Sequence, residues 1–147
     1  MSIIPTNNIY KGKNSNFVKT VLKNYECFHK NWKTSNYINL KLNSKKIIFI
    51  DETIQDTGAF KIRGATTGIN NILKKHPKIK TIVCASSGSF GISVSKICKV
   101  KNIKCVVFLP KNTPSIKKKK ILSLNTIIDE NNIDYDDAKK KCKKICI

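Results

Sequence analysis

The sequence predicts an α/β fold in which helices cover a parallel, doubly wound sheet. From residue 46 onward, short apolar runs alternate with segments whose apolar residues recur at helical spacing. The apolar runs are continuous, which is typical of strands buried on both faces of a parallel sheet. At 147 residues the chain is also long enough to bury the core of one such domain.

The predicted elements follow one another in a regular order. Strands are expected where β-branched and apolar residues are continuous, at 46–50, 81–85, 104–109 and 126–129. Helices are expected at 60–73, 91–100, 114–123 and 134–145. The third helix has the clearest start, because Thr113 is a typical N-cap residue and Pro114 suits the first helical position. Aspartates crowd the start of the last helix and lysines its end, as the helix dipole favours.

The first 33 residues are expected to form an N-terminal extension, and residues 34–147 the main domain. Within the extension we predict a helix over 16–28, anchored by Trp32. No apolar stretch after Met1 is long enough for a signal peptide, and no run of about 18 apolar residues is present. We therefore expect a cytoplasmic protein that does not insert into a membrane.

The formal charge of +20 would ordinarily suggest a nucleic acid or an anionic membrane as partner. The kind of charge argues against this. Of 29 basic residues only Arg63 is an arginine, whereas readers of nucleic acid draw on arginine for bidentate contacts. The lysines are also scattered along the chain, so a solvated lysine-rich surface is the better interpretation and no specific nucleic-acid partner is expected.

The six cysteines do not form a recognisable metal-binding pattern, since none is part of a Cys-x-x-Cys pair. Cys84 and Cys105 lie inside predicted strands, where a free cysteine behaves as a small buried apolar residue. Cys142 and Cys146 share one helix face, but a metal bound there would lack two ligands. We therefore expect reduced structural thiols and no metal site.

Lys61 stands between Phe60 and Arg63, just after a turn and at the start of a predicted helix. A cleft and the positive charge of Arg63 would both favour the neutral form of its amine, which is the nucleophilic form. About twenty-five residues later, the strand at 81–85 breaks into the turn Ser86–Gly91 and a further helix begins. Such a turn presents backbone N–H groups at the carboxyl end of a parallel strand, where anions bind. The two features together predict a reactive amine beside an anion-binding turn.

These two segments read QDTGAFKIRGA, from Gln55 to Ala65, and CASSGSFG, from Cys84 to Gly91. They resemble the fold-type II pyridoxal-phosphate enzymes, the tryptophan synthase β-like family, and TGAFKIRGA is closest to the serine/threonine dehydratase branch. The resemblance continues through 102–110 and 113–117 to the helix start at 134–138, and so covers roughly residues 34–147. It implies the N-terminal portion of that α/β fold.

The resemblance also implies roles for individual residues. Lys61 matches the family's Schiff-base lysine, which carries pyridoxal 5′-phosphate and later moves the α-proton of the substrate. The adjoining Phe60 is a candidate cofactor contact, although its place in the apolar stripe of the helix favours packing in the core. The family loop that holds the substrate's α-carboxylate is matched by Ser86, Ser87, Gly88 and Ser89. Ser89 stands where the family has an asparagine that touches the cofactor ring, so its contact would be weaker or mediated by water.

The family pattern is matched only in part outside Lys61 and the serine-rich turn. Glu52 agrees with the family's acid, whereas Asp51 stands where a lysine is usual. Thr34-Ser35 replaces the family's Thr-Pro. Arg63 matches the family's arginine, and we expect it to form a structural ion pair rather than to contact the substrate.

The function that the resemblance implies is a pyridoxal-phosphate-dependent lyase that dehydrates and deaminates serine or threonine. The alternatives are a β-replacement enzyme of the cysteine synthase kind, and an inactive remnant or binding subunit of the same family. Family members are longer and hold the cofactor phosphate with a later glycine-rich loop, whereas Gly91 is the last glycine of this sequence. We therefore expect an N-terminal fragment or half of a split enzyme. Its expected partners are a small amino-acid substrate and either a second copy or a complementing C-terminal half.

Overall fold

A computed structural model describes residues 33–146, which belong to one compact unit of the chain. The elements in chain order are β1 (Asn36–Leu42), β2 (Lys45–Asp51), α2 (Lys61–Lys75), β3 (Thr81–Ala85), α3 (Ser89–Val100), β4 (Lys104–Pro110), α4 (Ser115–Leu122), β5 (Ile127–Asn132) and α5 (Tyr135–Ile145). The helix predicted over 16–28 and its anchor Trp32 lie outside the described residues. Every other predicted element is present, with ends that differ from the prediction by at most three residues.

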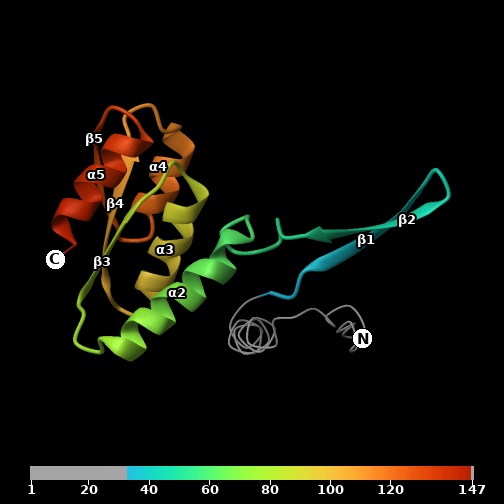
Figure 1. Ribbon diagram of the computed structural model, residues 1–147, viewed down its shortest axis with the longest axis horizontal. Helices are drawn as coiled ribbons and strands as arrows, with labels where there is room; N and C mark the ends of the chain where they lie inside the picture. Colours follow the sequence, from blue (N-terminus) through green and yellow to red (C-terminus); the bar gives the residue numbers. More distant parts are fainter. Residues whose placement is uncertain (1–32, 147) are drawn as a thin grey trace, which may run out of the picture. The chain divides into compact units, whose positions relative to one another are not determined.

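The strands β3, β4 and β5 form a parallel sheet in that order, as the sequence predicted. In Figure 1, α5 lies on one side of these strands and α3 and α4 lie on the other. This arrangement follows from the right-handed crossovers that join parallel strands. It places the carboxyl ends of the strands and the starts of the helices that follow them at one edge of the sheet.

The core has two layers because successive side chains of β4 point to opposite faces of the sheet. On one face, Val107 and Leu109 are fully buried beside the likewise buried Ile97 and Cys98 of α3. On the other face, Phe108 packs against α5 in a cluster with Ala138 and Cys142, joined by Val83, Ala85 and Val106. Helix α5 packs against both β3 and β4, which fixes its position on the sheet.

The strand predicted over 46–50 does not join the parallel sheet. It is part of β2, which pairs in antiparallel fashion with β1, a strand that we did not predict. Asn43 and Ser44 form the turn between them, both with positive φ, as in the two-residue turns that suit the twist of a hairpin. Neither strand packs against another helix or strand of the described chain.

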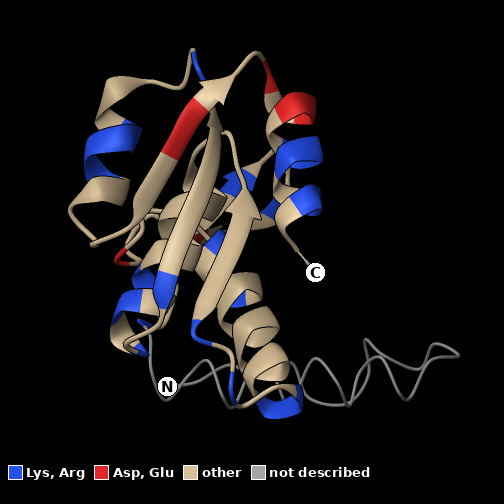
Figure 2. Cartoon of the chain, turned by 90° about the vertical axis from the view of Figure 1, so that its left-hand side faces the viewer, with Lys and Arg blue, Asp and Glu red and all other residues tan. Residues whose placement is uncertain are grey.

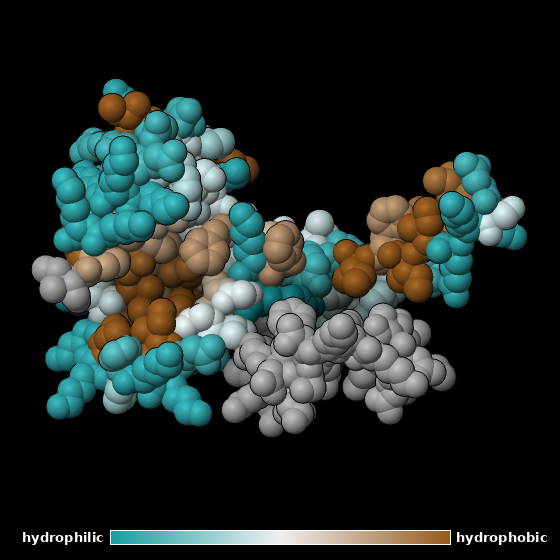
Figure 3. Space-filling model, viewed as in Figure 1, coloured by the Kyte–Doolittle hydropathy of each residue, from teal (hydrophilic) through white to brown (hydrophobic). Residues whose placement is uncertain are grey.

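One face of this hairpin is apolar and exposed. Cross-strand partners share a face, so the pairs Ile38–Phe49 and Leu40–Ile47 lie together with Leu42. Ile38, Leu40, Leu42 and Phe49 are each at least half exposed. Figure 3 shows the resulting brown patch over β1 and β2. The opposite face is more polar, since Asn39, Lys41 and Lys46 interrupt its apolar residues.

The start of α4 differs in detail from the prediction. Pro114, and not Thr113, occupies the N-cap position, and no side chain caps this helix. The backbone of Pro114 is extended, and the Thr113 N–H already donates to the Pro110 carbonyl within a turn. The Thr113 hydroxyl is buried without a hydrogen-bond partner. The helix therefore begins one residue later than the sequence suggested.

The charged residues lie mainly on the outer surfaces of the helices. Figure 2 shows lysine and arginine in blue on the helices, with red confined mainly to a stretch of β5 and the first turn of α5. Within the described part of the chain, no helix combines the length and the apolar character that a membrane crossing requires.

Candidate active site

A pocket of about 460 Å³ lies where the carboxyl end of β3 meets the starts of α2, α3 and α5. The start of α2 contributes Phe60, Lys61, Arg63 and Gly64 to its lining. The connection from β3 to α3 contributes Ala85, Ser86, Ser87 and Phe90, and α5 contributes Tyr135. The two motifs recognised in the sequence thus meet at a single pocket.

Lys61 is the first residue of α2 and its side chain is exposed. The adjoining Ile62 is completely buried and, with Ala65 and Ile69, forms the inner face of a helix that packs against α3. Because these apolar residues fix how the helix is rotated, they leave Lys61 on the pocket side. Phe60, at the N-cap position, is 61% exposed and stands beside it.

Arg63 is held by an acidic partner behind the pocket, as expected for a structural ion pair. Its Nε donates to both carboxylate oxygens of Glu52, at 3.1 and 3.0 Å, and its Nη2 lies 2.7 Å from Oε1. Ser35 joins this pair by donating to Glu52 and accepting from Arg63. Burial raises the pKa of Glu52, but the hydrogen bonds from Arg63 and Ser35 outweigh it, so the pKa lies below its ordinary value.

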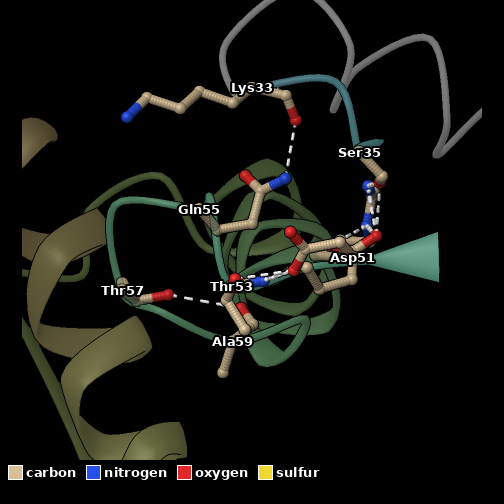
Figure 4. A network of polar contacts seen from close by, with 9 residues as sticks. Lys33, Ser35, Asp51, Thr53, Gln55, Thr57 and Ala59 are labelled. Carbon is tan, nitrogen blue, oxygen red and sulfur yellow. Dashed lines mark hydrogen bonds and ion pairs between the residues drawn. The ribbon is translucent and has the colours of Figure 1, made fainter. Parts of the chain in front are cut away.

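The loop between β2 and α2 is fixed by further polar contacts, which Figure 4 shows from close by. The Gln55 side-chain amide donates to the Lys33 carbonyl at 2.6 Å, and Gln55 is itself buried. The Asp51 carboxylate accepts from the backbone N–H and the hydroxyl of Thr53, at 2.8 and 2.6 Å. Asp56 forms ion pairs with Lys33 and Lys96, at 3.3 and 3.4 Å. The segment that leads to Lys61 is therefore held at several points.

The turn after β3 is organised by the Ser86 hydroxyl. Its Oγ accepts hydrogen bonds from the backbone N–H groups of Gly88 and Gly91, at 3.0 and 2.8 Å. Gly88 has a φ of +155°, which residues with a Cβ rarely adopt, and a Cβ there would lie 2.7 Å from Lys117 Cδ. Ser87 is exposed, and the N–H groups of Ser89 and Phe90 at the start of α3 make no hydrogen bond to another described residue, so these groups are available to a ligand.

The structure brings most of the predicted site residues to one place. Phe60, Lys61, Ser86 and Ser87 line the same pocket, whereas Gly88 and Ser89 belong to the same turn without lining it. Ser89 is the first residue of α3, and its carbonyl accepts from the Ser93 hydroxyl at 2.9 Å.

Two aromatic residues of the pocket, Phe90 and Tyr135, were missed by the sequence analysis. Phe90 lies inside the turn predicted at 86–91, but the motif gives it no role. Tyr135 could have been found from the topology of the sheet. It begins the helix that follows β5, and the carboxyl ends of parallel strands meet at one edge of the sheet.

A second pocket, of about 730 Å³, lies at the opposite edge of the sheet, near the starts of β3 and β4. Its lining includes Lys80, Lys101 and Lys104 beside apolar residues. This pocket is the larger of the two. Its lysines lie near the carboxyl ends of α2 and α3, where the helix dipole favours positive charge, so their presence does not by itself indicate a ligand site. It contains neither of the sequence motifs.

The cysteines of the described residues are free thiols. Burial raises the pKa of the Cys84 and Cys142 thiols, so that both stay protonated near neutral pH. Among the residues that the structure describes, no group of three or more histidine, cysteine or acidic side chains could hold a metal ion.

Comparison with known proteins connects this geometry to one family. A family model described as pyridoxal-phosphate dependent enzyme matches residues 34–147. Serine racemase of Dictyostelium discoideum is 39% identical over 84 residues, which cover 57% of this chain and 25% of the relative. The biosynthetic L-threonine dehydratase of Staphylococcus epidermidis is 36% identical over 81 residues, or 55% of this chain and 19% of the relative.

Among solved structures, a pyridoxal 5′-phosphate-dependent aspartate racemase superimposes with a TM-score of 0.82 at 24% identity. The match covers 88% of this chain and 42% of that one, and shows that the two share a fold. The matched segment spans about a quarter of the length of the curated serine racemases.

Proposed function

The chain belongs to the family of pyridoxal-phosphate dependent enzymes, whose cofactor is pyridoxal 5′-phosphate, and on this premise we propose that it serves a lyase reaction. In this reaction a small hydroxy amino acid, serine or threonine, eliminates water, and hydrolysis of the resulting imine by a water molecule releases ammonia and a 2-keto acid. The observation that carries the proposal is that Lys61 and the Ser86–Ser87 turn line one pocket. Similarity to an L-threonine dehydratase supports the choice of reaction.

The pocket residues fit the cofactor in size and in charge. A volume of about 460 Å³ lies within the range of about 300–1,000 Å³ that is typical of small-molecule sites. The cofactor is anionic and an amino acid carries a carboxylate, and the lining contains Lys61 and Arg63 but no acidic side chain. The exposed ring of Phe60 offers an apolar surface beside the amine for a flat aromatic ligand.

Within this proposal each residue has a defined task. Bound pyridoxal phosphate supplies an electron sink for the charge left at the Cα atom of the amino acid. Lys61 binds the cofactor through Nζ and, as a free amine, takes the proton from Cα. The turn closed by Ser86 orients the α-carboxylate with the N–H groups at the start of α3 and the Ser87 hydroxyl. Glu52 keeps Arg63 in place behind Lys61.

We further propose that residues outside this pocket hold the cofactor's phosphate, either in a complementing C-terminal segment or in a second copy of the chain. The pocket lining supplies an amine, aromatic rings and one turn. A phosphate is ordinarily held by several backbone N–H groups and the start of a helix. Mixing the chain with such a segment is expected to tighten cofactor binding, and titration of the cofactor's visible absorbance measures this.

The test of the proposed function uses the purified chain mixed with pyridoxal phosphate. Borohydride reduction followed by peptide mass mapping is expected to label Lys61 selectively, and Lys61→Ala is expected to lose that label. Lys119→Ala is the matched control, since Lys119 is an exposed lysine far along the chain in α4. Labelling spread over many lysines, and equal in all three proteins, would contradict the proposal.

Racemisation of serine is the second candidate, favoured by the 34–39% identity to serine racemases over more than half of this chain. Both reactions begin with removal of the proton from Cα, and they differ in whether a proton returns or the β-hydroxyl leaves. Measuring keto-acid release and D-serine formation in one sample of L-serine distinguishes them. D-serine without keto acid would favour the racemase and exclude the lyase.

A further inference from the structure

Tyr135 is the one pocket residue contributed by α5, the helix that packs on the opposite face of the sheet from α3. The proposed function gives it no task. Its side chain is 45% exposed, and its hydroxyl makes no hydrogen bond to another described residue. A buried tyrosine hydroxyl normally finds a protein partner, whereas one at the edge of a pocket is available to a ligand.

The backbone that carries Tyr135 is held rigidly. Asn132, at the end of β5, is 1% exposed, and its side-chain amide donates to the carbonyls of Leu109 and Asp129 at 2.9 and 3.0 Å. Directly before the helix, Asp134 accepts from the Asp137 N–H at 2.8 Å.

Asp137 completes a reciprocal cap, since its carboxylate accepts from the Ile133 N–H at 3.0 Å. Ala138, one turn into the helix, is fully buried in the cluster that also contains Ala85. These contacts place Tyr135 beside the end of β3, where the Ser86–Ser87 turn begins.

We propose that Tyr135 is a further substrate-binding residue of this site, and the inference rests on the proposed function. Its hydroxyl donates a hydrogen bond to the α-carboxylate that the Ser86–Ser87 turn receives. Its ring lines the pocket together with Phe60 and Phe90, which are 61% and 38% exposed. The ligand class is therefore a free amino acid with an unblocked carboxylate.

The variant Tyr135→Phe tests this inference because it keeps the ring and removes only the hydroxyl. With the full chain loaded with pyridoxal phosphate, L-serine is titrated and the change in visible absorbance gives its dissociation constant. A hydrogen bond to a charged group implies weakening by about 10- to 100-fold. Labelling of Lys61 and the thermal unfolding midpoint are expected to stay as in the unaltered protein.

Tyr37→Phe is the matched control, since Tyr37 is a similarly exposed tyrosine that lies in the hairpin. An unchanged dissociation constant for L-serine in Tyr135→Phe would overturn the inference. Loss of Lys61 labelling in Tyr135→Phe would also overturn it, because the hydroxyl would then act on the fold or the cofactor. Failure of the unaltered protein to label Lys61 selectively is seen before serine is added, and overturns the proposed function together with this inference.

Discussion

The hydroxyl group of Ser86 holds together the turn that lines the candidate site. The sequence indicated a serine-rich turn beside Lys61, and the structure shows that Ser86 is buried and bonded to Gly88 and Gly91 within the turn. The neighbouring Ser87 is exposed to the pocket. Two adjacent serines thus differ in what they can offer a ligand, because one closes the turn and the other faces outward.

At the residue scale, the first prediction concerns Glu52, whose pKa is held below its ordinary value. A lowered folded-state pKa stabilises the protein above the unfolded pKa of about 4.3, and this stabilisation is lost as the pH falls through the folded pKa. Glu52→Gln is therefore expected to lower the free energy of unfolding by about 1–2 kcal/mol at pH 7. Urea unfolding at pH 7 and pH 3 should show the two proteins converging in acid.

Glu130→Gln serves as the control for this experiment. Glu130 forms an ion pair as well, with Lys118, but its side chain is 52% exposed, so little change is expected at either pH. A Glu52→Gln deficit that persists unchanged at pH 3 would mean that packing, and not charge, holds this carboxyl in place.

A second prediction concerns Gly88, whose φ of +155° is a backbone conformation that residues with a Cβ rarely adopt. Gly88→Ala is expected to lower the free energy of unfolding by about 1–3 kcal/mol, since the backbone must leave this conformation. Gly68→Ala is the control, because Gly68 lies inside α2 with open space around it. There, alanine should stabilise the protein by about 0.5–1 kcal/mol. Equal effects of the two substitutions in chemical unfolding would refute the argument.

At the scale of elements, the sequence predicted those whose burial leaves a clear pattern. The strand at 81–85 was predicted with both ends correct, because this apolar run is too short for a helix and rich in β-branched residues. The hairpin strand β1 was missed, although its alternating apolar residues are visible in the sequence, because its partner, the strand predicted at 46–50, was expected to belong to the parallel sheet. The cap at Thr113 was wrong because Pro114 is extended and itself takes the N-cap position, which leaves the Thr113 hydroxyl one residue too early to cap the helix. Tyr135 could be assigned to the pocket only with knowledge of which strand ends meet at the same edge of the sheet.

The cap of α5 yields a prediction at this scale. Asp134 accepts from the Asp137 N–H, and the helix it starts packs against both β3 and β4. Asp134→Ala is expected to lower the free energy of unfolding by about 1 kcal/mol. Asp136→Ala removes a neighbouring charge of the same sign without a cap bond, and should cost about 0.3 kcal/mol. Thermal unfolding of both variants measures the difference, and equal losses would assign the effect to the helix dipole alone.

At the scale of the whole molecule, the net charge of +20 acts on stability. Nine acidic residues face 29 basic ones, so most lysines lack an acidic neighbour and repel one another in the compact state. Raising the salt concentration from about 10 mM to 0.2 M shortens the range of this repulsion. The unfolding midpoint is therefore expected to rise with sodium chloride in a thermal scan. A midpoint that falls would mean that the ion pair of Arg63 and Glu52 and others like it dominate.

The hairpin gives the molecule a second, opposing surface property. The lysine-covered helices present a hydrophilic surface. In contrast, β1 and β2 present four large apolar side chains on one face, each at least half exposed to water. A chain built in this way is an amphiphile, with a hydrophilic body and a water-avoiding strand pair. It should gather at air–water boundaries and bind phenyl resins at salt levels that leave other strongly cationic proteins in solution. Salt that screens the repulsion between the lysines will also strengthen the binding of this apolar face to such surfaces.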